Sequence, residues 1–154
     1  MKILSGGQTG VDRAALDTAI EKGLAYGGWC PRGGLAEDLP KPPGLLALYP
    51  DLQETPLADP TQRTEWNVRE ADRLMILVDR AGIGVSKGTE AAREFALMLD
   101  KPCIVLDLDR ESAREQARAF LAEGKGGSLC IAGPRESEAP CIYAKACAFL
   151  REVL

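Results

Sequence analysis

Apolar residues along this chain occur in two patterns. In some segments they form short continuous runs, which are typical of strands buried in a parallel sheet. In others they recur every three or four positions, which is typical of helices with one buried face. The runs predict strands at residues 3–4, 24–29, 45–49, 74–78, 103–106 and 129–132. The periodic segments predict helices at residues 12–22, 60–71, 111–123 and 140–154, and a further helix that begins near residue 88.

The alternation of strands and helices predicts the fold class. We expect an α/β protein with a three-layer Rossmann-like fold, in which helices flank a mostly parallel sheet of five or six strands. A chain of 154 residues fits one domain, so residues 1–154 are predicted to form a single ligand-binding domain. Asp59 and Pro60 suit the start of one helix, and Asp109 is expected to cap the helix at 111–123.

A glycine-rich segment at residues 5–10 joins the first strand to the first helix. The first N–H groups of a helix have no partner within the helix and lie at the positive end of its dipole, so such a junction binds anions. The segment lacks the first glycine of the dinucleotide-binding pattern, which Ser5 replaces, and no Gly-Lys-Ser/Thr of a Walker loop follows it. The alternative is a turn that only tightens the corner between strand and helix.

A second glycine-rich segment, at residues 82–90, follows the apolar strand at 74–78 and leads into another helix. Ligands of open parallel sheets bind beyond the carboxyl ends of the strands, where the strand order reverses. If the strands at 3–4 and 74–78 are neighbours, both helix N-termini face one crevice. The polar segment at 32–44 is too rich in glycine and proline for regular structure, and a loop of this length is more often functional than idle.

Residues of these segments and of the helix at 60–71 form the predicted site. The candidates for binding a phosphate are Ser5, Gly6, Gly7, Gln8, Thr9, Gly10, Arg13, Arg32, Lys87, Gly88 and Thr89. The candidates for binding the polar edges of a ring are Glu37, Asp38, Arg63, Thr64, Asn67 and Glu90. A few polar groups of this kind orient the ligand in small-molecule pockets. Each cation could equally be a solvated surface charge, and the acids could merely neutralise the arginines.

Charge and composition exclude several classes of protein. The chain has 19 basic and 23 acidic residues and a net charge of −4, which argues against a nucleic-acid partner. It has neither an apolar run of 18 residues nor a signal-peptide pattern, so we expect no membrane contact and a cytoplasmic location. Five cysteines without a C-x-x-C pair, and no histidine, argue against a disulfide framework, a protein-bound metal and a histidine-activated nucleophile. No catalytic residue is predicted.

Five sequence blocks resemble the molybdenum carrier protein family, which is related to the molybdenum cofactor carrier of algae. The blocks are SGGQTGVDRAALD, GGWCPRGGLAED, YPDLQET, RTEWNVREAD and SKGTE. The resemblance implies a Rossmann-like fold, a homo-oligomer (dimer or tetramer) and molybdenum cofactor as cargo. It also implies a superfamily that includes the lonely-guy phosphoribohydrolases and the DNA-processing proteins, whose shared site binds nucleotide-like ligands. Lys87 departs from the pattern, since relatives often have a small residue there.

Two functional hypotheses follow. The first is a non-catalytic binding or carrier protein for a phosphate-bearing heterocycle held at the two glycine-rich segments. Molybdenum cofactor fits through its phosphate and its pterin, which could stack on Trp29 or Trp66, and nucleotides fit the same description. The alternative is a nucleotide-binding enzyme of the phosphoribohydrolase type. That chemistry, in the lonely-guy pattern, uses a glutamate three residues after the Gly-Thr pair, where this chain has Ala92, so hydrolysis is disfavoured.

Overall fold

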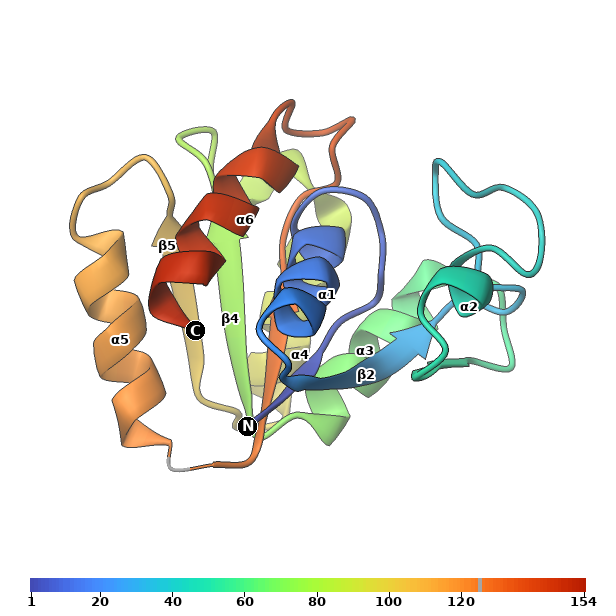
Figure 1. Cartoon of the computed structure of the whole chain (residues 1–154), viewed down its shortest axis with the longest axis horizontal. Helices are drawn as coiled ribbons and strands as arrows, with labels where there is room; N and C mark the ends of the chain where they lie inside the picture. The colour runs from blue at the N-terminus through green and yellow to red at the C-terminus, as the bar shows by residue number, and fades with distance from the viewer. Residues whose placement is uncertain (125) are drawn as a thin grey trace.

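The computed structural model describes residues 1–124 and 126–154 and has a six-stranded sheet between two layers of helices (Figure 1). Every pair of neighbouring strands is parallel, in the order β3-β2-β1-β6-β4-β5. The strands are β1 (Lys2–Leu4), β2 (Ala25–Cys30), β3 (Leu52–Glu54), β4 (Arg73–Val78), β5 (Cys103–Asp107) and β6 (Ser128–Ala132). The predicted α/β Rossmann-like fold is therefore confirmed.

Helices cover both faces of this sheet. They are α1 (Val11–Glu21), α2 (Leu45–Leu48), α3 (Pro60–Glu70), α4 (Lys87–Met98), α5 (Ala113–Glu123) and α6 (Ile142–Val153), with a 3-10 turn, η1 (Ile83–Val85), before α4. Figure 1 shows α1 and α6 side by side in front of the sheet and α3 and α4 behind it. No helix in the described part of the chain is long and apolar enough to cross a membrane.

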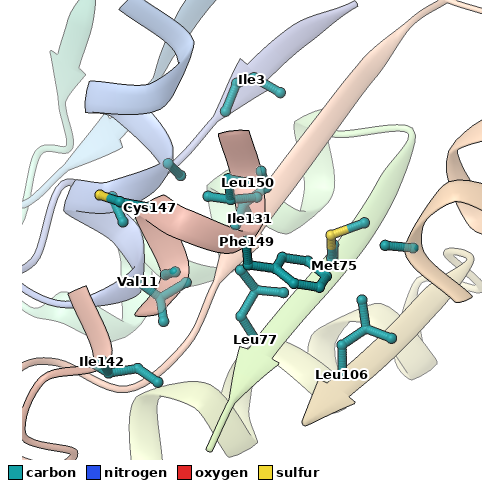
Figure 2. Close-up of a cluster of buried hydrophobic side chains, with 14 of the residues drawn as sticks. Ile3, Val11, Met75, Leu77, Leu106, Ile131, Ile142, Cys147, Phe149 and Leu150 are labelled. Atoms are coloured by element: carbon teal, nitrogen blue, oxygen red, sulfur yellow. The ribbon is translucent and has the colours of Figure 1, made fainter. Parts of the chain in front are cut away.

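Strand β4 shows why the sheet is apolar on both faces. All six of its residues are buried, because helices pack on each side of it. Met75 and Leu77 point into a cluster with α1, α5 and α6, which also contains Phe149 and Leu150 (Figure 2). Its alternate residues Leu74, Ile76 and Val78 pack against α3 and α4 on the opposite face. The period of two along a strand thus divides one continuous apolar run between two cores.

A third apolar cluster lies under the segment that joins β2 to α3. Leu16 of α1 and Cys30 of β2 pack there against Leu45, Tyr49 and Leu52. The prediction of a strand at 45–49 is wrong, because this stretch forms the short helix α2, in which the N–H of Tyr49 bonds to the carbonyl of Leu45 over 2.8 Å. The edge strand follows as β3, which pairs with β2.

One further expectation is corrected, and a question that the sequence left open is answered. Ser112, not Asp109, precedes α5, and the Asp109 carboxylate instead accepts from the backbone N–H of Arg80 at 3.1 Å and from Lys145 Nζ at 2.7 Å. The strands at 3–4 and 74–78 are not neighbours, because β6 lies between β1 and β4 and pairs with both. The last strand of the chain therefore occupies the place where the strand order reverses, and it brings the loop that follows it to this edge.

Candidate ligand-binding site

A cavity of about 390 Å³ opens at the carboxyl ends of β1, β4 and β6. Four segments far apart in the sequence form its walls, which is the arrangement expected at the edge of a parallel sheet where the strand order reverses. The lining residues are Gln8 and Asp12 after β1; Pro60, Arg63 and Thr64 at the start of α3; Val85, Ser86, Lys87, Gly88, Thr89 and Ala92 after β4; and Ala132 at the end of β6 with Gly133, Arg135 and Glu138 after it. Both glycine-rich segments thus contribute to one cavity, although their strands are not adjacent.

The N-terminus of α4 faces this cavity. Ser86 is its N-cap, and its hydroxyl oxygen accepts from the backbone N–H of Thr89 at 3.3 Å and from the Thr89 hydroxyl at 2.9 Å. Lys87 and Gly88 form the first turn, and a Cβ built on Gly88 would meet Ser86 Oγ at 4.0 Å, so the backbone there is open. The unpaired first N–H groups of a helix and its dipole give such an end a partial positive charge, which favours anions.

The segment at residues 5–10 is committed mainly to contacts within the protein. The Ser5 hydroxyl donates to the Ile131 carbonyl at 3.0 Å, and the backbone N–H of Val11 donates to the Pro134 carbonyl at 3.2 Å. The Gln8 side-chain oxygen accepts from the N–H of Thr9 at 3.0 Å. Gly7 has φ of 71° and does not line the cavity, and a Cβ added to it would meet the side chain of Leu45. Of the predicted phosphate-binding residues 5–10, only Gln8 lines the cavity.

A buried ion pair stands in the cavity wall. Arg63 Nη1 of α3 lies 2.7 Å from Asp12 Oδ2 of α1, and the two side chains are 14% and 5% exposed. The guanidinium covers the backbone of Gly6 so closely that a Cβ there would overlap Nη1, which explains the glycine. Burial raises the pKa of the Asp12 carboxyl, and the charge and hydrogen bond of Arg63 offset this only in part.

Arg63 retains unused hydrogen-bonding capacity. Its Nε is buried and has no hydrogen-bond partner among the described residues. A small void of about 10 Å³ adjoins the main cavity and is lined by Gly6, Asp12, Arg63 and Thr64, among others. The Arg63 and Thr64 side chains, both predicted to bind ring edges, therefore lie at the cavity.

Glu37 joins the segment at 32–44 to the rim of the cavity. Its carboxylate accepts hydrogen bonds from the hydroxyls of Thr9 and Ser137, the latter at 2.6 Å, and Arg135 Nε lies 3.7 Å away. Partial burial acts to raise the pKa of Glu37, but the hydrogen bonds from Ser137 and Thr9 outweigh it and lower that pKa. Arg135 also contacts Glu138 at 3.2 Å, so this cavity-lining cation is held by two acids.

Other predicted site residues lie outside the cavity lining. Arg13 pairs with Asp38, and the Asn67 amide bonds to both backbone groups of Trp29 at 2.8 Å each. The exposed side chains of Arg32 and Glu90 are also outside it, as are Trp29 and Trp66, which pack edge-to-face with ring centroids 4.7 Å apart. Local polarity marked Arg13, Asp38 and Asn67 as candidates, but their hydrogen bonds join separate segments of the chain.

Four polar lining residues were not among the predicted site residues: Asp12, Ser86, Arg135 and Glu138. Asp12 stands in the first turn of α1 and Ser86 at an N-cap, two positions that a sequence can mark. Arg135 and Glu138 follow β6, whose place in the sheet only the structure gives. Within residues 1–124 and 126–154, no group of three histidine, cysteine, aspartate or glutamate side chains has the arrangement of a metal site.

Comparisons with known proteins place the chain in a family. Residues 3–154 match the model of the circularly permutated YpsA SLOG family. A crystal structure named "Putative molybdenum carrier protein", from Syntrophus aciditrophicus SB, is 41% identical, with a TM-score of 0.87, over 99% of this chain and 94% of that one. A comparison with curated proteins gave no match. The resemblance to the molybdenum carrier proteins is therefore confirmed, and the chain belongs to the circularly permutated YpsA SLOG family.

Proposed function

We propose that this protein is a non-catalytic binding or carrier protein for a phosphate-bearing heterocycle, with molybdenum cofactor as the first candidate cargo. The observation that carries the proposal is the 390 Å³ cavity with the α4 N-terminus in its wall. A volume of this size lies within the range of small-molecule pockets, roughly 300–1,000 Å³. The name of the 41% identical protein supports the choice of cargo.

The phosphate is assigned to the start of α4. Lys87 adds a cation at the first helical position, and Ser86, Gly88 and Thr89 line the same wall. Arg135, from the loop after β6, brings a second cation to the cavity. A dianionic phosphate suits this end, since the free N–H groups of the helix and the charged side chains can donate to it. Hydrogen bonds to an ionised acceptor are stronger than those between neutral groups.

The nature of the residue at position 92 supports binding without hydrolysis. Ala92 lines the cavity where the phosphoribohydrolase pattern would have a glutamate, while the exposed Glu90 lies outside the lining. A methyl group cannot activate water or stabilise a developing positive charge at a sugar. Release of ribose 5-phosphate from AMP by the purified protein would contradict this assignment.

We further propose that the protein is a cytoplasmic homo-oligomer. Leu97 and Met98 at the end of α4 are 68% and 78% exposed, and Val105 on the edge strand β5 is 40% exposed. Exposed apolar residues near a sheet edge are typical of surfaces that a partner covers. Light scattering coupled to size-exclusion chromatography should give a mass of two or four chains, and a monomeric mass would contradict the proposal.

Isothermal titration calorimetry tests the carrier function. The wild-type protein should bind molybdenum cofactor or at least one nucleotide, and Lys87→Ala should weaken that binding by about 1–3 kcal/mol because a charged hydrogen bond is lost. Lys22→Ala removes an exposed lysine at the far end of α1 and is the matched control. Absence of binding by the cofactor and by every nucleotide, with circular dichroism showing an intact fold, would overturn the proposal.

A further inference from the structure

The ion pair of Asp12 and Arg63 carries an inference about the ring of the ligand. Asp12 has the least exposed side chain of the charged residues in the cavity wall, at 5%, compared with 14% for Arg63, 20% for Glu138 and 45% for Arg135. Because Asp12 is paired with Arg63, this wall offers a phosphate no net positive charge, unlike the start of α4 with Lys87. This difference therefore separates the part of the ligand that contacts α1 from the part that contacts the start of α4.

Both members of the pair have hydrogen-bonding capacity beyond their mutual contact. A carboxylate has about four acceptor sites, and Arg63 Nη1 takes one of them at 2.7 Å. A guanidinium has five N–H donors, and among the described residues only Nη1 of Arg63 forms a hydrogen bond. The N–H groups of Nη2 are therefore free to donate beside the cavity, whereas the unpaired Nε is buried. The pair thus presents an acceptor and a donor side by side on one wall.

An acceptor beside a donor is complementary to a ring edge that has a donor opposite the acceptor and an acceptor opposite the donor. The lactam edge of a 2-amino-4-oxo ring, as in guanine and pterin, has N–H donors next to a carbonyl oxygen. Adenine has a ring nitrogen acceptor and an amino donor in the corresponding places, so it would set a lone pair against Asp12 and leave the Arg63 donor unsatisfied. Buried polar groups left unpaired in this way are the strongest source of discrimination between similar ligands.

We propose that Asp12 and Arg63 recognise the lactam edge of the ligand, so that the protein selects phosphate esters of guanine-type or pterin-type rings over those of adenine. Asp12 accepts from the ring N–H and the amino group, and Arg63 donates to the ring carbonyl. This inference rests on the proposed function, since it concerns the ring end of the ligand whose phosphate lies at α4.

Calorimetry with four probes tests the assignment. GMP, IMP and AMP differ only at this edge of the base, and ribose 5-phosphate lacks the base. For the wild type we expect GMP to bind about 10- to 100-fold more tightly than AMP, as for a bidentate pair reading a base. IMP, which keeps the N–H and the carbonyl but lacks the amino group, should lie between them. In Asp12→Asn the preference for GMP should fall to less than about threefold, while ribose 5-phosphate binds as it does to the wild type.

The controls separate this inference from the function on which it rests. Asp38→Asn removes a carboxylate that also pairs with an arginine but lies outside the cavity lining, so it should keep the preference for GMP. The wild-type series needs no variant, so poor folding of Asp12→Asn would leave the test intact. Equal affinities for GMP and AMP would overturn the ring assignment while leaving the phosphate site standing. Failure of ribose 5-phosphate and all three nucleotides to bind would overturn both.

Discussion

Arg13 of α1 holds Asp38 through two hydrogen bonds, 3.1 Å from Nη1 to Oδ2 and 3.0 Å from Nη2 to Oδ1. The Arg13 Nε also donates to the Gly7 carbonyl at 3.0 Å, and the guanidinium lies 5.9 Å from the centre of the Tyr49 ring. One side chain therefore joins the first glycine-rich segment to the segment at 32–44. Arg13 was predicted to bind phosphate because it is a fixed cation beside glycines. In the structure the same guanidinium links the two segments.

Replacing Arg13 with alanine is therefore expected to lower stability more than affinity. Because Asp38 is partly exposed, solvent screens the ion pair and the loss should be about 1–2 kcal/mol, most of it from the hydrogen bonds to Gly7 and Asp38. Thermal unfolding measures this change, and calorimetry with ribose 5-phosphate should show less than a threefold change in affinity. A large loss of affinity at unchanged melting temperature would contradict this prediction and show that Arg13 contacts the ligand.

The same pair predicts a pH dependence. The hydrogen bonds from Arg13 hold the pKa of Asp38 below its ordinary value of 3.8, so the unfolded chain binds the proton more readily. The stabilisation from Asp38 is thus complete well above pH 3.8 and is lost as the pH falls through the lowered pKa. Asp38→Asn should melt below the wild type at pH 6, and the difference should shrink progressively as the pH is lowered below 3.8. A difference that stays constant over this range would contradict the pairing.

Gly7→Val should destabilise the fold. Valine disfavours the φ of 71°, and its Cβ would stand 3.0 Å from Leu45 Cδ1 and 3.3 Å from Leu52 Cδ1. Backbone strain and overpacking together should cost about 2–4 kcal/mol, measured by urea unfolding. Gly23→Val is the matched control, since Gly23 has φ of 65° but no atom within 4 Å of its Cβ position, so only the strain remains. Equal losses in the two variants would show that the contact with Leu45 is unimportant.

Asn67→Ala should also act on stability. The Asn67 amide accepts from the Trp29 N–H and donates to the Trp29 carbonyl, each at 2.8 Å, and it thereby holds α3 against β2. Alanine leaves both backbone groups without this partner, which should cost about 2–4 kcal/mol of unfolding free energy. Chemical denaturation measures the loss. The preference for GMP over AMP should persist in the folded fraction, and its disappearance would mean that Asn67 contacts the ring.

Sequence patterns predicted those elements that local chemistry defines. The helix that begins at Pro60 has the predicted cap, since Asp59 Oδ1 accepts from the Thr61 N–H at 2.8 Å, and the run that ends at Val78 is a buried strand. The stretch at 45–49 was wrongly predicted because its apolar residues fit a strand or a short helix equally well. Its packing against Leu16 and Leu52 accompanies the helical form, and such contacts cannot be found from a local pattern.

The sequence by itself determined the layers of this protein: which runs are apolar on both sides, which segments have one apolar face, and where glycine permits a turn. Tertiary structure alone decided which polar groups meet. Insertion of β6 between β1 and β4 brings Arg135 and Glu138 to the cavity, and the packing of α3 against β2 and β6 places Arg63 beside Asp12 of α1. Hydrophobic periodicity is a local property, whereas strand order and ion pairing depend on residues distant in sequence, so the chemistry of the site follows from the fold.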